Sequence, residues 1–167
     1  GGSTAGALLA QRGRRVVVLE RQRFPRFHIG ESLLPASAPV LALLGLSEAM
    51  DKRFVRKYSA RFLDDAADPE SPEATARYGF AEAFPPATPY AWQVTRAEFD
   101  ELLLRRAAAL GAEVREGWRV ERPIFEGSTI VGVEACGPGG EARRIGARVV
   151  IDASGRDSLL AQSTGRK

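Results

Sequence analysis

Two short, continuous apolar runs constrain the fold of this chain more than any other feature. Residues 15–20 read Arg-Val-Val-Val-Leu-Glu, and residues 147–152 read Ala-Arg-Val-Val-Ile-Asp. Each run has the length of a strand and lacks the alternation of a strand with one solvated face. Such runs are typical of strands that are covered on both faces in a parallel sheet. We therefore expect an α/β fold in which both runs are sheet strands.

Glycines mark the ends of three expected helices. A glycine adopts the left-handed conformation that closes many helices, so it commonly follows the last turn. The three segments followed by such a glycine are residues 3–12, 36–44 and 96–110. A final helix is expected after Arg156.

Further strands are expected outside the parallel sheet. Residues 53–63 alternate in polarity and predict one strand, with Phe54, Tyr58 and Phe62 on one face. An acidic, proline-containing surface loop is expected at residues 64–73, and a short strand at 90–95. A β-meander is expected over residues 113–117, 119–125 and 129–136.

The composition excludes several classes of protein and site. No apolar run approaches the roughly 20 residues that cross a bilayer. With one cysteine, Cys136, and one histidine, His28, a Cys/His zinc site cannot be assembled, and no metal is expected. The net charge of +3, from 24 cationic and 21 acidic residues, is too small to predict nucleic-acid binding. The single cysteine fits a reducing compartment, so we expect a cytoplasmic location.

The first residues predict a dinucleotide-binding β-α-β unit. Glycines let the backbone approach a pyrophosphate at a helix N-terminus, where N–H groups and the helix dipole stabilise negative charge. Glu20, at the end of the first apolar run, is the acid expected at the ribose. About three helical turns fit between Gly2 and Gly13, so Gly2 fits the last glycine of GxGxxG. We therefore expect the first strand upstream of residue 1, and poor folding of this fragment alone. An ordinary α/β turn, with glycines that serve only packing, is the alternative.

Three sets of motifs are more specific than the glycines. They are Leu19-Glu-Arg21 with Phe24-Pro-Arg26 and Ile29-Gly-Glu-Ser-Leu-Leu-Pro35, then Trp92-Gln-Val-Thr-Arg-Ala-Glu-Phe-Asp100, then Val150-Ile-Asp-Ala-Ser-Gly155. Together they closely resemble motifs of the flavin-dependent halogenases, within the wider group of FAD-dependent monooxygenases and geranylgeranyl-reductase-like enzymes. The resemblance covers essentially the whole chain. It implies FAD in a Rossmann-like domain of the glutathione-reductase type, with the C-terminal part beyond residue 167.

The resemblance also implies which residues hold the adenosine and pyrophosphate of FAD. Gly1 and Gly2 would lie near the pyrophosphate, and Glu20 at the ribose. Arg21 would lie beside the adenosine, with a solvated strand-end cation as the alternative.

Other residues are implied toward the flavin end of the cofactor. The turn formed by Gly30, Glu31 and Ser32 would pass near the isoalloxazine. Arg96 and Asp152 would face the phosphates or the ribityl chain. A cation in the first turn of a helix favours an anionic partner, which supports Arg96. Asp152 has a simpler alternative as the cap of the final helix.

Lys57 is the residue on which the halogenase interpretation depends. Flavin-dependent halogenases carry a lysine after the GES motif, five residues before a phenylalanine, and Lys57 and Phe62 have that offset. In that family reduced FAD, O₂ and halide yield hypohalous acid, which a lysine ammonium can polarise or carry as a haloamine. Only three of the 24 cationic residues are lysines, and this rarity favours a specific role for Lys57. The alternative is that Lys57 belongs to a solvated basic run at residues 52–57. Many halogenases have a glycine where Tyr58 and Ser59 stand.

We therefore expect part of an FAD-dependent oxidoreductase of secondary metabolism, halogenase-like, acting on an electron-rich substrate. The substrate would be free or tethered to a carrier protein, and a separate reductase would supply reduced flavin. The alternatives are a hydroxylating monooxygenase or geranylgeranyl-reductase-like enzyme, and a non-catalytic dinucleotide-binding module. Residues 1–52 would begin the FAD-binding domain, 53–95 would form the substrate-side sheet, and 96–167 would return to the FAD-binding domain.

Overall fold

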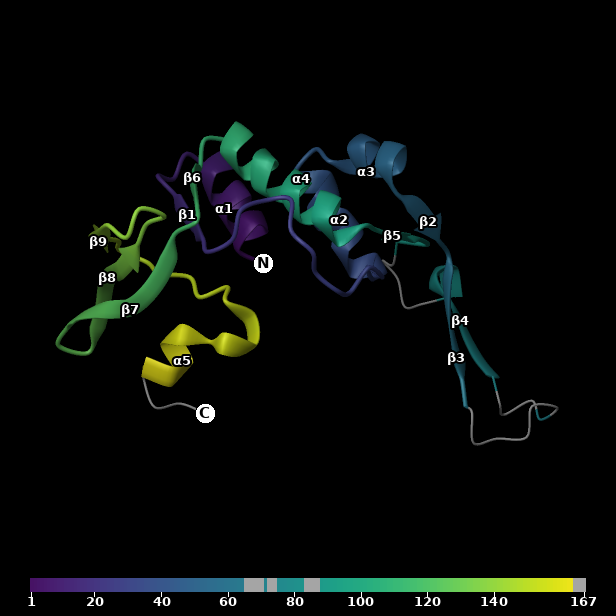
Figure 1. Cartoon of the computed structure of the whole chain (residues 1–167). Helices are drawn as coiled ribbons and strands as arrows, with labels where there is room; N and C mark the ends of the chain where they lie inside the picture. The colour runs from purple at the N-terminus through teal and green to yellow at the C-terminus, as the bar shows by residue number, and fades with distance from the viewer. Residues whose placement is uncertain (65–70, 72–74, 83–87, 164–167) are drawn as a thin grey trace. The chain divides into compact units, whose positions relative to one another are not determined.

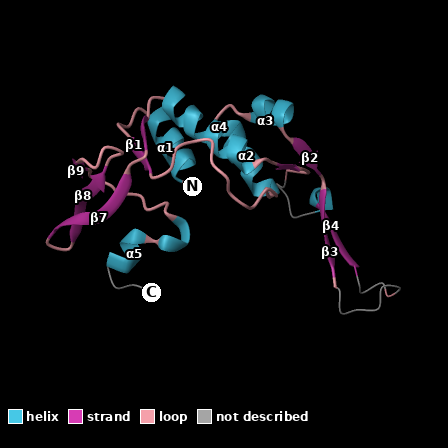
Figure 2. Cartoon of the chain, in the orientation of Figure 1, coloured by secondary structure: helices cyan, strands magenta, loops and turns pink. Residues whose placement is uncertain are grey.

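The computed structural model describes residues 1–64, 71, 75–82 and 88–163 (Figures 1 and 2). The chain divides into two compact units, Gly1–Phe27 with Phe99–Lys167, and His28–Glu98. Most of the expected acidic loop at 64–73 lies outside the described residues. The three-part functional division stays a prediction, because these units are defined by compactness and not by what they bind. No helix among the described residues is long and apolar enough to span a bilayer.

The first unit contains a two-stranded parallel sheet with a helix packed on it. Helix α1 (Gly2–Gln11) leads into strand β1 (Val17–Glu20), as the sequence predicts. β1 pairs in parallel with β6 (Glu113–Glu116) over its whole length. The helix lies so close to β1 that a Cβ atom on Gly6 would be 2.7 Å from Val18 Cγ2. The expected α/β architecture is therefore present around β1.

A β-meander lies in the same unit, displaced along the sequence from its predicted place. It consists of β7 (Arg119–Glu126), β8 (Thr129–Cys136) and β9 (Ala142–Gly146), each antiparallel to the next. The prediction is wrong for residues 113–117, because that segment is β6 and pairs with β1. Most of β9 is exposed, including Arg143 and Arg144, so its sequence has little of the apolar pattern that predicts a strand.

The second apolar run is not a strand in this structure, so the prediction for residues 147–152 is wrong. Val149 and Ile151 are 75% and 54% exposed. The amide of Ala147 donates to the carbonyl of Val131 at 2.8 Å, but no described strand pairs along the rest of the run. An apolar sequence forms a strand only where a neighbour completes its hydrogen bonds. The chain continues into a 3-10 turn at Gly155–Asp157 and helix α5 (Leu159–Ser163), where a final helix is expected.

The second unit packs short helices around strand β5 (Ala91–Gln93). After a 3-10 turn (Pro35–Ser37) come α2 (Ala38–Leu43) and α3 (Ser47–Arg53). Leu44, Met50 and Trp92 are almost completely buried and form the centre of its core. Helix α2 is predicted from the sequence, but α3 is not, because only Met50 of its seven residues is buried and the apolar period is weak. Helix α4 (Arg96–Ala109) follows β5 as expected and contributes residues to both units.

Residues 53–63 form two strands rather than the single predicted strand. β2 (Val55–Lys57) pairs with β5, whereas β3 (Ser59–Leu63) pairs with β4 (Thr75–Gly79). The break at Tyr58 also overturns the predicted apolar face: Phe54 is buried, but Tyr58 and Phe62 are 59% and 61% exposed. A short 3-10 turn (Phe80–Glu82) follows β4 and brings the buried Phe80 beside β2.

Candidate cofactor and catalytic sites

Gly1 and Gly2, at the start of α1, form a narrow cradle with the methyl group of Ala153. A Cβ atom on Gly2 would lie 3.2 Å from the Cβ of Ala153, and one on Gly1 would lie 3.8 Å from it. The first turn of α1 contains no acidic residue, and no described side chain caps it. The helix N-terminus presents N–H groups and the positive end of its dipole to any ligand placed here. These features fit the pyrophosphate of a dinucleotide, because a side chain at Gly2 would crowd the cradle.

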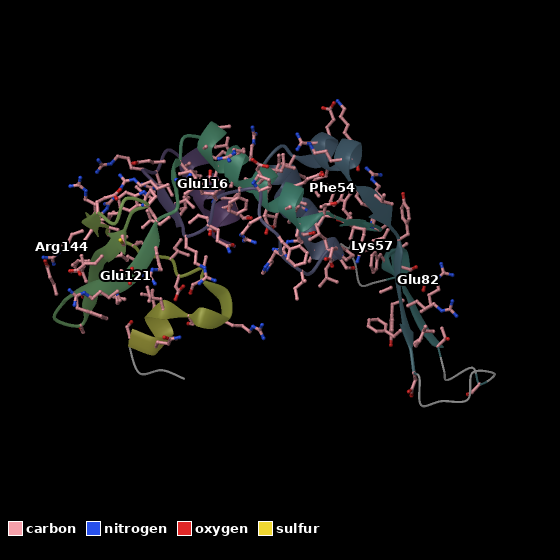
Figure 3. All side chains as sticks on the ribbon, in the orientation of Figure 1. Phe54, Lys57, Glu82, Glu116, Glu121 and Arg144 are labelled. Atoms are coloured by element: carbon pink, nitrogen blue, oxygen red, sulfur yellow. The ribbon has the colours of Figure 1, made fainter. Side chains whose placement is uncertain are left out.

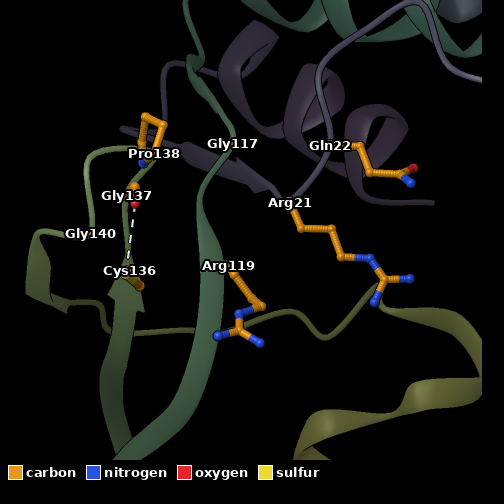
Figure 4. A pocket seen from close by; sticks show the side chains of 8 residues that line it. All are labelled: Arg21, Gln22, Gly117, Arg119, Cys136, Gly137, Pro138 and Gly140. Carbon is orange, nitrogen blue, oxygen red and sulfur yellow. Dashed lines mark hydrogen bonds between the residues drawn. The ribbon is translucent and has the colours of Figure 1, made fainter.

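Glu20 and Arg21 lie where β1 ends. The Glu20 carboxylate accepts a hydrogen bond from the backbone N–H of Gln22, at 2.9 Å. Arg21 lines a pocket of about 480 Å³, together with Gln22, Gly117, Arg119, Cys136, Gly137, Pro138 and Gly140 (Figure 4). Two guanidinium groups, from Arg21 and Arg119, therefore line one pocket, and they suit a ligand with an anionic group. Arg119 was not identified from the sequence, because it lies distant from Arg21 along the chain.

Asp152 is a cap within its own segment. Its carboxylate accepts hydrogen bonds from the hydroxyl and amide of Ser154, at 2.6 and 2.9 Å, and from the amide of Leu160, at 2.8 Å. Burial acts to raise the pKa of Asp152, but these hydrogen bonds outweigh burial and lower it. Asp152 thus occupies the simpler of its two expected roles, at the start of α5. A contact with FAD stays a prediction.

Glu116 supports the loop after β1 and was not identified from the sequence (Figure 3). One carboxylate oxygen accepts a hydrogen bond from the backbone N–H of Phe24, at 2.6 Å, and the other pairs with Arg105, at 2.5 Å. Burial acts to raise the pKa of Glu116, but the Phe24 amide and the Arg105 guanidinium together lower it. The pair of bonds ties the end of β6 to the loop that carries Arg21.

In the second unit, the Gly30–Ser32 turn is held from two sides. Gly30 has a φ of 98°, which favours glycine, and Arg96 Nη1 donates to the carbonyls of Ile29 and Gly30 at 2.8 and 3.3 Å. On the other side, the amide of Val94 donates to the carbonyl of Glu31, at 2.8 Å. Arg96 therefore braces this turn, and its contact with the phosphates or the ribityl chain of FAD stays a prediction.

Lys57 and Ser32 meet at this turn. The Lys57 ammonium donates a hydrogen bond to the Ser32 hydroxyl, and its nitrogen lies 5.6 Å from the centre of the Phe80 ring. Lys57 ends β2 and pairs with Ala91, while Ser32 forms a bridge with Gln93, so β5 holds both residues. Partial burial lowers the pKa of Lys57, because it disfavours the charged ammonium.

A polar clamp fixes β2 to helix α3. Asp51 accepts two hydrogen bonds from Arg56, at 2.7 and 2.5 Å, and one from the Trp92 indole, at 3.0 Å. The Arg56 guanidinium also stacks over the Tyr90 ring at 4.0 Å. These contacts lower the pKa of Asp51, the Arg56 hydrogen bond above all. Arg56, the residue before Lys57, is therefore held by both Asp51 and the Tyr90 ring.

The residues predicted from the sequence thus fall into two groups, one in each unit. The first unit holds Gly1, Gly2, Glu20, Arg21 and Asp152, and the second holds Gly30, Glu31, Ser32, Lys57 and Arg96. Within the described parts of the chain, no cluster of three or more His, Cys, Asp or Glu side chains could hold a metal ion.

The comparison with protein families decides the affiliation of the chain. The family described as tryptophan halogenase matches residues 72–166, more than half of the chain. The chain belongs to this halogenase family. Its membership agrees with the flavin-dependent halogenase resemblance of the motifs at residues 19–35 and 150–155.

Individual relatives of this halogenase-family chain are similar over nearly its whole length. A flavin-dependent halogenase of Armillaria mellea is 38% identical over 96% of the chain, which covers 31% of that protein. A chlorinase of Pseudomonas fluorescens that acts on 1H-pyrrole-2-carbonyl-[peptidyl-carrier protein] is 33% identical over 98% of the chain and 39% of its own length. The myxobacterial chondrochloren halogenase has a similar structure, with a TM-score of 0.86, 38% identity, and coverage of 97% of this chain and 36% of that one. The chain therefore spans about a third of the length of these proteins.

Proposed function

We propose that this chain supplies the first part of the FAD-binding domain and the catalytic lysine of a flavin-dependent halogenase. The observation that carries the proposal is the position of Lys57, whose ammonium is held at the Gly30–Ser32 turn. The family affiliation and the named activities of the relatives support the same reading. The hydroxylating and reductase alternatives share the flavin motifs without making halogenated products.

Each group of residues has its own proposed part in binding FAD. Gly1 and Gly2 would leave room for the pyrophosphate at the start of α1, while Glu20 and Arg21 would take the ribose and the adenosine. The Gly30–Ser32 turn, braced by Arg96, would approach the isoalloxazine. Reduced FAD, when bound, supplies two of the four electrons that reduce O₂, and the halide supplies the other two as it becomes hypohalous acid.

Lys57 would act on the oxidised halogen. An ammonium donates hydrogen bonds to the oxygen of hypohalous acid and withdraws charge from it, which makes the halogen more electrophilic. The lowered pKa of Lys57 increases the share of neutral amine, so the same nitrogen is also able to carry the halogen as a haloamine.

The substrate, partners and location are proposed at the level of chemical class. An electron-rich aromatic group is the natural acceptor of an electrophilic halogen, and the Pseudomonas chlorinase acts on such a group tethered to a carrier protein. We propose a free or carrier-tethered substrate of this class, a separate reductase as the source of reduced flavin, and a cytoplasmic location.

The test uses the full-length protein with reduced FAD, O₂ and either bromide or chloride. Hypohalite is trapped with a generic amine, and hydrogen peroxide is measured in parallel. Halide-dependent haloamine from the wild-type protein is the expected result. Hydrogen peroxide alone, at the same rate with and without halide, would refute halide oxidation and favour a monooxygenase or reductase.

A further inference from the structure

The side chain of Lys57 reaches across strand β5 to a hydroxyl on the other side. Val55 and Lys57 of β2 occupy one edge of β5, opposite Gln93 and Ala91. Ser32 also lies opposite Gln93, so it occupies the second edge. Directly opposed residues share one face of a sheet, as do residues two apart along a strand. The side chains of Lys57, Ala91 and Ser32 therefore emerge on one face.

Ala91 makes this reach feasible. It lies between the two edges, its side chain is a single methyl group, and it is completely buried. A larger residue here would occupy the space that the lysine stem crosses. The backbone around Ser32 is fixed in addition, because the amide of Leu33 donates to the carbonyl of Trp92 at 3.0 Å.

The Lys57 nitrogen has a hydroxyl and an aromatic face as neighbours. It donates to Ser32 and lies over the ring of Phe80, which is 7% exposed. The Phe80 amide donates to the carbonyl of Tyr58, the residue after Lys57, at 2.9 Å, so the ring is tied to the same strand end. Among the residues that the structure describes, no carboxylate forms an ion pair with Lys57.

We propose that Ser32 is the positioning residue of Lys57: its hydroxyl, with the Phe80 ring, fixes the lysine nitrogen in place. This inference rests on the proposed function of Lys57. A serine hydroxyl both donates and accepts, so it holds the nitrogen as ammonium and as free amine. A carboxylate would instead favour the ammonium alone and would compete with hypohalous acid for its protons. From the sequence, Ser32 was expected only to lie near the isoalloxazine of FAD.

The test compares Ser32→Ala with Ser32→Thr and with Ser37→Ala in the full-length protein. Thr keeps the hydroxyl, and Ser37 is a matched control because its hydroxyl donates to the carbonyl of Leu34. The first readout needs no cofactor: partial acetylation with acetic anhydride, followed by peptide mass spectrometry, gives the labelling rate of Lys57 relative to Lys52. The second readout is kcat for hypohalite trapped with an amine, and the third is the Kd for FAD.

In Ser32→Ala we expect faster labelling of Lys57 and a roughly tenfold lower kcat, the effect of losing one hydrogen bond to a charged group. Ser32→Thr should restore labelling and kcat, and Ser37→Ala should match wild type. Unchanged labelling of Lys57 in Ser32→Ala would overturn the proposal, and weaker binding of FAD in that case would assign Ser32 to the cofactor alone. If the wild-type protein yields no hypohalite, the proposed function fails, whereas the labelling ratio still reports the Ser32–Lys57 contact.

Discussion

Gly30 is the residue at which a side chain would do most harm to the turn beside Lys57. Its φ of 98° is unfavourable for any residue with a Cβ atom, and that atom would lie 3.2 Å from Arg96 Nη1. We predict that Gly30→Ala lowers the unfolding free energy by about 1–2 kcal/mol. The measurement is urea unfolding, with Gly146→Ala as the control, because a Cβ there would have no atom closer than 3.9 Å. Equal stability of the two variants would contradict this role of Gly30.

At the scale of single residues, the sequence singled out candidate residues but did not predict their contacts. The offset of Lys57 from Phe62 and the GES motif singled out Lys57 and Ser32, but nothing local indicated that they touch, because β5 brings them together from positions 25 residues apart. Arg96 and Asp152 were expected to face the phosphates or the ribityl chain of FAD, with a helix cap as the alternative for Asp152. Their observed partners are the backbone of Ile29 and Gly30, and the start of α5, and loop geometry of this kind has no sequence period.

At the scale of elements, Gly6 decides how closely α1 packs on β1. In an ordinary helix, replacing glycine with alanine stabilises by about 1 kcal/mol. Here the new Cβ would lie 2.7 Å from Val18 Cγ2, so we predict a loss of about 1–3 kcal/mol for Gly6→Ala. Thermal unfolding of Gly6→Ala, Val18→Ala and the double variant tests the cause. The double variant should regain part of the loss, and strict additivity of the two changes would argue against a steric origin.

The link between β6 and the loop after β1 has a defined pH dependence. The pKa of Glu116 is lowered in the folded state, so the carboxylate stabilises the fold above its unfolded pKa of about 4.3, and this contribution is lost as the pH falls through the folded pKa. We predict that Glu116→Gln lowers the unfolding free energy by about 1–2 kcal/mol at pH 7. The difference from wild type should shrink as the pH falls below about 4. A difference that is independent of pH would refute the role of the charge.

Local signals predicted several elements correctly, but they did not show whether a strand finds a partner in the chain. Helices α1 and α4 and strand β1 match their expected ranges within a few residues. Residues 147–152 have the same apolar signal as β1 but no described partner strand, so they remain irregular. Residues 53–63 are also divided by their partners, because β5 pairs with the first part of this alternating segment and β4 pairs with the second part.

At the scale of the whole molecule, binding of FAD should couple to stability. A ligand that binds only the folded state stabilises it by about 2.7 kcal/mol at a hundredfold excess over Kd. We predict that FAD raises the Tm of the full-length protein, and that Gly2→Val reduces the shift because a side chain there meets Ala153. Gly146→Val is the control, and an equal FAD-induced shift in both variants would rule out the cradle at the start of α1.

The central claim is that Lys57 handles the oxidised halogen, and one comparison tests it most directly. Lys57→Ala and Lys52→Ala are assayed side by side in the full-length protein for haloamine and hydrogen peroxide formed per O₂ consumed. Lys52 is a matched control, because it is exposed and pairs with Glu48 at 2.6 Å. We predict that Lys57→Ala loses about tenfold or more of the trapped haloamine, whereas Lys52→Ala matches wild type. Wild-type yields of haloamine from Lys57→Ala would contradict the account.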